Sequence, residues 1–478
     1  MKKFIKNNFT KNYIISISEI ISRIPLIFTV GYLASNIGPE VFGAWSLVLV
    51  VQALSVSISG AGFTSALIRY VPNASKDDAY QFLFLSIKRS AFFLLIISIL
   101  IYIFYDFIGS LLNIDKEYRW LLIATCVMAI GSIMDGLLDK YFKARILITK
   151  QILYLFTRTV AEVVSVIVVF NFLDFSHASS ALLSYILIVV VFKIAIYPWL
   201  FLDRRSSIKE KIKLNAKNSF LKFSYLLLPS ALLAWLIIQI DRIILGWMLD
   251  SSEFGVYAFS ATLASYLVFL SYSIMPLFQS HAAKFYDQGR FQDLQNLFEI
   301  WQYMFISAAS ILLLLLVFFS QEILYFTGGT DFAGLPNILL ILSAAVCIDQ
   351  FFGQYELIFS LANKPKLITL VYVIKLFLMI IFIPIFAYFF GIYGAVLGII
   401  ISVIIVNLFR YANATKLIAI KLTFFLKMYI VILIALILIL SQVQNLSLIT
   451  KSFFSIILVL IISLIFFKDR KKISYIED

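Results

Sequence analysis

The sequence predicts an all-α membrane protein that crosses the bilayer about fourteen times. Hydrophobic residues make up 62% of the 478 residues and charged residues only 14%, whereas soluble proteins contain roughly 25% charged residues. Apolar stretches recur along the whole chain, each close to the roughly 20 residues that a membrane-spanning helix requires. Basic residues gather between alternate stretches, which is typical of a multi-pass protein whose cytoplasmic loops set its topology.

Windows of about 20 apolar residues mark the candidate spans. They are 12–34, 42–64, 86–108, 118–141, 150–172, 180–202, 224–249, 254–280, 298–320, 334–361, 367–390, 392–412, 424–441 and 449–467. The region 367–412 could form two helices or one kinked helix, and the GIYG sequence from Gly391 to Gly394 favours two.

The basic residues test this arrangement. With the N-terminus in the cytoplasm, 31 of the 39 basic residues lie in cytoplasmic segments and three lie outside, at Lys116, Arg119 and Lys451. Removing one helix would invert part of this pattern, so we expect an even number of spans with both termini in the cytoplasm. The net charge of +13 then comes from basic residues that set the orientation of the spans. We expect no nucleic-acid binding, because no basic patch lies on a soluble domain.

The chain is expected to contain two related halves. EVFGAW, from Glu40 to Trp45, opens the second span, and the similar EFGVY opens the eighth. Asp139 and Arg158 have the same separation in the sequence as Glu356 and Lys375. One shift along the chain therefore takes Asp139 to Glu356 and Arg158 to Lys375, and we call this shift the repeat offset.

These repeats predict two six-helix bundles, a common transporter plan. The first half is expected at 1–202 and the second at 224–415, with a cytoplasmic linker at 203–223 between them. Two additional helices and a basic tail are expected at 416–478.

Catalytic and metal-binding motifs do not occur in the sequence. It has no H-E-x-x-H, G-x-S-x-G, P-loop or C-x-x-C pattern. Cys126 and Cys347 each lie within an apolar stretch, where packed thiols are expected. We therefore predict a transporter without a cofactor or metal, rather than an enzyme.

Among the charged residues within the predicted spans, ten are the candidates for a functional role. Each would cost about 2.5–3.5 kcal/mol at the bilayer centre if it faced lipid, so these side chains must pair, reach the interface or face a polar interior. Asp241 and Arg242 are adjacent, about 100° apart around a helix, so at least one should point into an internal cavity. The cations are Arg23, Arg158, Lys193, Arg242 and Lys375, and the acids are Glu19, Glu162, Asp241, Asp349 and Glu356.

Several of these charges have a structural interpretation. Lys193, Arg158 and Lys375 lie roughly 12–14 Å from a cytoplasmic helix end, within partial reach of a snorkelling side chain. Arg23 lies too deep for this, and a cavity position is favoured for it. Glu19 and Arg23 are spaced i,i+4, so they could neutralise each other, and Arg158 repeats this spacing with Glu162.

Three segments resemble the polysaccharide transporter family. They are SRIPLIFTVGYLASNIGPEVFGAWSLVLVVQALSVSISGAGFTSALIRYV near the N-terminus, QIDRIILGWMLDSSEFGVYAFSATL at 239–263, and FFGIYGAVLG at 389–398. This family contains the O-antigen and capsule-unit flippases of the multidrug/oligosaccharidyl-lipid/polysaccharide exporter superfamily. The resemblance covers about residues 10–415.

The resemblance implies two six-helix bundles around a central cavity that opens alternately to each side of the bacterial cytoplasmic membrane. It implies a cargo of oligosaccharide on an undecaprenyl pyrophosphate carrier, bound in part by cations of the cavity. Arg23 and Arg242 match that role through their segments, and the other three cations are candidates by depth alone. The acids, Glu19 and Asp241 foremost, are candidates for coupling to protons or sodium. A polymerase and a chain-length regulator of the same pathway are the implied protein partners.

Two alternatives remain at this point. Acids at depth are as numerous as cations, which leaves open an ion-coupled drug or cation antiporter of the same superfamily, because such a protein requires an acidic cavity. A membrane enzyme such as a polysaccharide polymerase is the other alternative. It usually requires a large outer loop or a catalytic His/Asp set, and the sequence has neither.

Overall fold

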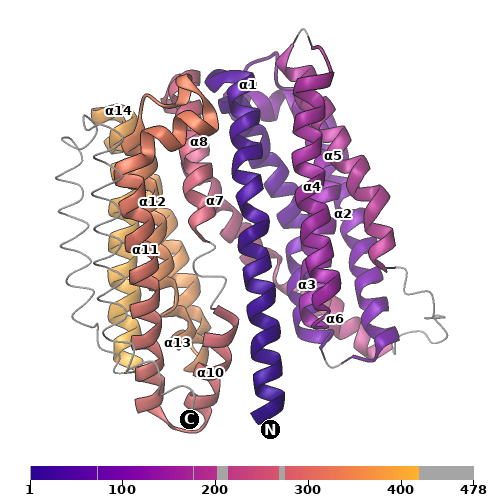
Figure 1. The fold of residues 1–478 in the computed structure, drawn as a ribbon, viewed down its shortest axis with the longest axis vertical. Helices are drawn as coiled ribbons and strands as arrows, with labels where there is room; N and C mark the ends of the chain where they lie inside the picture. Colours follow the sequence, from indigo (N-terminus) through magenta and orange to yellow (C-terminus); the bar gives the residue numbers. More distant parts are fainter. Residues whose placement is uncertain (1, 73, 176, 202–213, 269–274, 419–478) are drawn as a thin grey trace. The chain divides into compact units, whose positions relative to one another are not determined.

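The structure is a computed structural model that describes residues 2–72, 74–175, 177–201, 214–268 and 275–418. Within these ranges the chain folds into helices and contains no β-strand (Figure 1). Nine helical segments of the described chain are long and apolar enough to cross a membrane. The all-α, multi-pass prediction is therefore confirmed. The predicted spans 424–441 and 449–467 lie outside the described residues.

The chain separates into two compact units. One comprises Tyr13–Ala258, and the other comprises Met1–Asn12 together with Phe259–Asp478. The boundary between the units therefore falls within an α-helix rather than in the expected linker at 203–223, most of which lies outside the described residues. The proposed division into sequence halves stays a prediction about the repeat.

The unit Tyr13–Ala258 contains most of the predicted N-terminal spans. Its first helix includes two of them, because Gly38 has a φ of 77° and is followed by Pro39, so the chain leaves the helical path there. Ser75 caps the next helix, accepting from the Asp78 amide. The elements are α1 (Lys2–Tyr70), α2 (Lys76–Leu111), α3 (Leu121–Ala144), α4 (Ile148–Phe172), α5 (Ala178–Phe201), α6 (Leu214–Leu226), α7 (Leu228–Met248) and the start of α8 (Ser251–Ser265).

The other unit contains the remaining described elements. They are the end of α8, η1 (Tyr266–Val268), α10 (Met275–Asp287), α11 (Phe291–Gly328), η2 (Thr330–Phe332), α12 (Pro336–Gly353), α13 (Glu356–Leu361) and α14 (Pro365–Leu417).

Two predicted spans of this unit differ from the structure, and one uncertain region is settled. The α-helix expected over 254–280 ends at Ser265 and passes into a 3-10 turn. The span expected over 334–361 is confirmed as one apolar segment, Pro336–Leu361, but its helix is interrupted between Gly353 and Glu356. In α14, Gly391 has a φ of 58°, which separates two helical segments. The GIYG turn therefore forms two helices over 367–412, as predicted.

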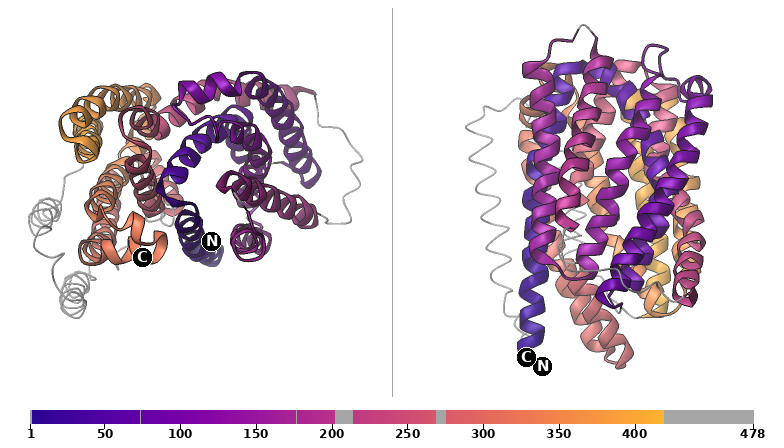
Figure 2. Two further views of the ribbon diagram at one scale, coloured as in Figure 1. Left: turned by 90° about the horizontal axis from the view of Figure 1, so that it is seen from above. Right: turned by 90° about the vertical axis from the view of Figure 1, so that its right-hand side faces the viewer.

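Packing brings together the helices that carry internal charge. In the first unit α3, α4 and α5 pack against one another, and in the second α14 packs against both α12 and α13. Figure 2 shows these helices end-on and from the side. Large apolar side chains such as Phe92, Phe156 and Phe377 are exposed on the outer faces of α2, α4 and α14, as expected of helices that meet lipid. The opposite faces are left for polar groups.

Candidate functional site

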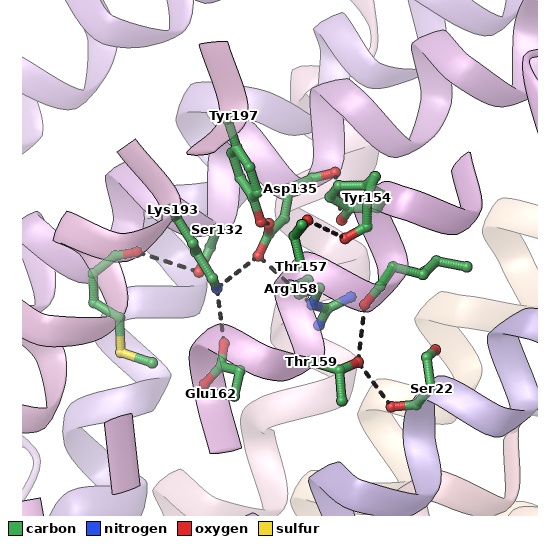
Figure 3. A network of polar contacts seen from close by, with 12 residues as sticks. Ser22, Ser132, Asp135, Tyr154, Thr157, Arg158, Thr159, Glu162, Lys193 and Tyr197 are labelled. Atoms are coloured by element: carbon green, nitrogen blue, oxygen red, sulfur yellow. Dashed lines mark hydrogen bonds and ion pairs between the residues drawn. The ribbon is translucent and has the colours of Figure 1, made fainter. Parts of the chain in front are cut away.

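A buried cluster of charges joins α3, α4 and α5. We call Asp135, Arg158, Glu162, Lys193 and Tyr197 the amino-terminal cluster (Figure 3). The Lys193 ammonium lies 2.9 Å from Asp135 Oδ2 and 2.7 Å from Glu162 Oε1, and its side chain is only 5% exposed. Two acids and two cations make the cluster neutral, which is how charges are tolerated away from water.

Tyrosine hydroxyl groups complete the hydrogen bonding of the two acids. Tyr197 donates to Asp135 Oδ1, and Tyr185 donates to Glu162 Oε2 at 2.6 Å. Tyr154 donates to the backbone carbonyl of Asp135 at 3.1 Å. Both carboxylates therefore have a hydroxyl and an ammonium partner, and their positions are fixed by three helices.

Arg158 is the accessible member of this cluster. Its Nε lies 3.7 Å from Asp135 Oδ2, and its side chain is 40% exposed. Phe156 and Ile167 mark the exposed apolar face of α4, and Arg158 lies about 160–180° from both at about 100° per residue. Its exposed part therefore faces away from the apolar surface of the helix.

A second buried cluster joins α12, α13 and α14. We call Asp349, Glu356, Tyr372, Lys375 and Arg410 the carboxyl-terminal cluster. Arg410 contacts both acids, with Nη1 3.3 Å from Asp349 and Nη2 2.8 Å from Glu356. Lys375 lies 2.7 Å from Asp349, and the Tyr372 hydroxyl donates to Glu356 at 3.1 Å. This cluster is also neutral.

The two clusters are connected in the same way. In each, a central cation contacts two acids, a peripheral cation contacts one of them, and a tyrosine hydroxyl donates to a carboxylate. The repeat offset that takes Arg158 to Lys375 also takes the central cation Lys193 to the central cation Arg410. The repeat offset therefore relates a third pair of corresponding charged positions in the two halves.

Sequence reasoning missed two charged members of these clusters and both tyrosines. Asp135 lies in the predicted span 118–141 but is not among the candidate acids. Arg410 lies near the end of the predicted span 392–412 and is one of the 31 basic residues counted as cytoplasmic, although it is buried at 2% exposure. The repeat offset applied to Lys193 is the signal that could have identified Arg410. No comparable signal marks Asp135, because the same offset leads from it to Phe352.

The structural interpretations of Lys193 and of the two i,i+4 pairs need correction. Lys193 does not snorkel, because its ammonium is held between Asp135 and Glu162. Neither expected i,i+4 pair forms among the described residues: Glu162 pairs with Lys193, and Glu19 pairs with Lys143 of α3. Contacts between helices replace local ones because the partner side chains lie closer across the helix packing than along one helix.

Arg23 lies beside the contact between α1 and α4. The Thr159 hydroxyl donates to the backbone carbonyl of Ser22 at 3.1 Å, so Arg23 and Arg158 each adjoin a residue of this contact (Figure 3 labels Ser22, Thr159 and Arg158). Arg23 is half-buried, and it lies about 140° from the exposed Phe28.

Asp241 and Arg242 lie on α7. The Tyr257 hydroxyl of α8 donates to Asp241 Oδ2, which occupies part of this carboxylate. Arg242 is one helical turn from Ile238, whose side chain is 67% exposed, so the two share a face. The prediction that one of the adjacent charges faces a cavity stays a prediction.

Cysteines and acids show no metal-binding geometry in the described part of the chain. Cys126 and Cys347 are buried free thiols, which confirms that they pack in the interior. Among residues with defined placement, no group of three His, Cys, Asp or Glu side chains is arranged to hold a metal ion.

Comparisons with known proteins agree on one kind of fold. A family model described as polysaccharide biosynthesis protein matches residues 9–280. A structure of the lipid II flippase MurJ, inward closed, has a TM-score of 0.68 at 16% identity, covering 95% of this chain and 99% of that one. An inward-facing MATE multidrug resistance transporter of the MOP superfamily has a TM-score of 0.64 at 16% identity, covering 85% and 98%.

A third structure belongs to a MOP superfamily transporter from Pyrococcus furiosus, with a TM-score of 0.57, 17% identity and coverage of 85% and 96%. A search of the curated proteins found no match. At these identities the structural likeness concerns the fold, and it confirms the predicted class of polytopic transporter fold.

Proposed function

Because the chain belongs to the polysaccharide biosynthesis protein family, we propose that it moves an oligosaccharide on an undecaprenyl pyrophosphate carrier across the bacterial cytoplasmic membrane. The family match over residues 9–280 is the observation on which this depends, and it confirms the family resemblance of the sequence. The fold, which is similar to that of a lipid II flippase, supports movement of a lipid-linked cargo from the inner to the outer leaflet. The polymer made from this cargo is O-antigen, capsule or exopolysaccharide.

The cargo determines what the protein must supply. A pyrophosphate group carries about two negative charges and must leave bulk water to cross, so the path needs cationic groups. Arginine offers paired N–H donors to phosphate oxygens, which an ammonium does less well. We assign this role to Arg23, Arg158 and Arg242. Lys193 and Lys375 are close to carboxylates at 2.7–2.9 Å, so they act on cargo less directly.

The charge clusters favour this function over a cation antiporter. A cationic drug requires an acidic group that is free to bind it, but each acid of the two clusters is already matched by Lys193, Arg158, Arg410 or Lys375. We propose that coupling to protons or sodium, if it uses Glu19, Glu162, Asp241, Asp349 or Glu356, acts by changing the contacts of these acids rather than by binding cargo. These contacts are ion pairs for four of them and the hydrogen bond from Tyr257 for Asp241.

Deletion of the gene in the native bacterium tests the function. We expect lipid-linked repeat units to accumulate on the cytoplasmic leaflet and surface polysaccharide to be lost, measured by extraction of lipid-linked saccharide and by staining of surface polymer. Unchanged surface polysaccharide with raised sensitivity to cationic dyes would instead support the antiporter.

Complementation with variants tests the assigned cations. Arg23→Ala and Arg242→Ala should abolish or sharply reduce export at normal membrane abundance, checked by blot. Lys at either position should retain part of the activity, because the charge remains while the paired donors are lost. Normal export by both alanine variants would show that these arginines are structural.

We also propose that both termini lie in the cytoplasm and that a polymerase and chain-length regulator use the cargo on the outer face. Reporter fusions after Asp203 and Asp478 should report the cytoplasm, and fusions after Asp250 and Ser447 the exterior. An exterior reading at Asp478 would contradict fourteen spans.

A further inference from the structure

Arg158 is a cation with incomplete partners. Its Nε atom is buried and has no hydrogen-bond partner, and the nearest carboxylate oxygen lies 3.7 Å away, beyond the 2.7–3.2 Å of a normal N–H···O hydrogen bond. Asp135 is already occupied, since Lys193 binds one carboxylate oxygen at 2.9 Å and Tyr197 donates to the other. The contact between Asp135 and Arg158 is therefore electrostatic and loose.

The corresponding cation of the carboxyl-terminal cluster differs in both respects. Lys375 lies 2.7 Å from Asp349 and its side chain is 14% exposed, whereas Arg158 is 40% exposed. Both occupy the peripheral position, and the repeat offset relates one to the other. Only the amino-terminal cluster therefore combines an accessible guanidinium with an acid held at a distance.

The acid at this site is held in place independently of Arg158. Lys193 is central to the cluster, and the Tyr154 hydroxyl binds the Asp135 backbone carbonyl. An oxyanion approaching the exposed part of Arg158 would compete with Asp135 for the guanidinium without displacing the rest of the cluster. A transporter needs such an arrangement, because a cargo that is bound too tightly is not released.

We propose that Asp135 is a built-in competitor for the phosphate groups of the cargo: it occupies Arg158 loosely when no cargo is bound and weakens the binding of phosphate so that release is possible. The inference rests on the proposed function for the identity of the cargo, but its chemistry requires only a phosphate or pyrophosphate ligand. Arg158 is the binding residue, and Asp135 and Lys193 are positioning residues.

Binding of inorganic pyrophosphate to the purified full-length protein tests this directly, by calorimetry in nanodiscs of uncharged lipid. Asp135→Asn keeps the shape of the side chain and removes its charge, so we expect pyrophosphate to bind about tenfold more tightly. Arg158→Gln should weaken binding at least about tenfold. Asp106→Asn is the matched control, because it removes one negative charge from the Arg119 ion pair outside the cluster and should leave affinity unchanged.

The pattern of affinities decides the outcome. Tighter binding by Asp135→Asn alone, together with reduced polysaccharide export in cells, supports the proposal because cargo is then retained. Equal tightening by Asp106→Asn would show a general charge effect and overturn it, as would unchanged or weaker binding by Asp135→Asn. Should Asp135→Asn not fold, as judged by gel filtration, retention of wild-type affinity by Arg158→Gln overturns it, since Arg158 is half-exposed.

The binding measurement is independent of the cellular function. If deletion of the gene leaves surface polysaccharide intact, the proposed cargo is wrong, yet the effects of Asp135→Asn and Arg158→Gln on pyrophosphate affinity still test the competitor. Conversely, a failed competitor leaves the flippase assignment unaffected.

Discussion

The two charge clusters share a plan but differ in how firmly they hold their outer cation. In the amino-terminal cluster Arg158 is 3.7 Å from its acid and 40% exposed, and in the carboxyl-terminal cluster Lys375 is 2.7 Å from its acid and 14% exposed. The central cations, Lys193 and Arg410, are both almost fully buried. The comparison indicates that the central position maintains the packing of three helices in each half, whereas the peripheral position is free to specialise.

The largest expected effect follows removal of a central cation. Lys193→Met or Arg410→Met leaves two buried carboxylates without their shared partner, and we expect each to lower the free energy of unfolding by about 3–5 kcal/mol. Thermal unfolding in detergent would measure this. Adding Asp135→Asn to Lys193→Met should restore part of the loss. If removal of the central cation in one half left the free energy of unfolding unchanged, the two clusters would not be equivalent.

The two peripheral cations should differ in how much they stabilise the fold, whereas the two central cations should contribute similar amounts. Lys375→Ala removes a close and mostly buried ion pair, so we expect a loss of about 2–4 kcal/mol. Arg158→Ala removes a loose, half-exposed contact, so we expect less than about 1 kcal/mol. Unfolding of both variants under the same conditions gives the comparison. Equal losses would indicate that Arg158 is as structural as Lys375 and would argue against its role in binding cargo.

Removing a tyrosine hydroxyl should lower the stability less than removing a central cation, and by a similar amount in the two clusters. Tyr197→Phe and Tyr372→Phe each remove one hydroxyl that donates to a buried carboxylate, so each should cost about 1–3 kcal/mol. Tyr197 is 2% exposed, and its loss should lie at the upper end. The change in thermal unfolding midpoint would be compared with that of Tyr388→Phe, whose side chain is 80% exposed. An effect no larger than this control would show that the hydroxyl is replaced by water.

The sequence predicts the helices better than their contacts. Hydropathy locates the spans because lipid requires every outward side chain to be apolar. The turn at Gly391 is predictable because glycine adopts its φ of 58° more readily than other residues do. The end of α8 at Ser265 was not predicted, since its apolar composition continues beyond the helix. Hydropathy does not report such interruptions within a span.

The candidate site was predictable only in part. Depth in the spans identified Lys193 and Glu162, but their pairing depends on the packing of α4 and α5, and local spacing suggested the wrong partner. Asp135 carries no signal that distinguishes it from an interfacial acid until its contact with Lys193 is seen. The repeat offset is a long-range signal, and it relates the two central cations, Lys193 and Arg410. It does not relate the acids, because Asp139, which it takes to Glu356, pairs with Lys143 outside the amino-terminal cluster.

The smallest expected effect concerns the space beside Lys193. Gly131 of α3 faces the stem of this lysine, and an added Cβ would lie 3.3 Å from Lys193 Cδ, a tight contact. At Gly60 of α1 an added Cβ would meet only Ile133 at 3.6 Å, an ordinary van der Waals distance. The repeat offset leads from Gly131 to Ile348, so the carboxyl-terminal half has no glycine at the matching position.

Gly131→Ala and Gly60→Ala therefore separate two contributions. Both gain helix propensity, by about 0.5–1 kcal/mol, but only Gly131→Ala moves the lysine stem, which we expect to cancel about the same amount. Gly60→Ala should raise the unfolding midpoint and Gly131→Ala should leave it nearly unchanged. If both raise it equally, α3 does not confine Lys193, and the fixed placement of its ammonium between Asp135 and Glu162 must come from the acids and tyrosines alone.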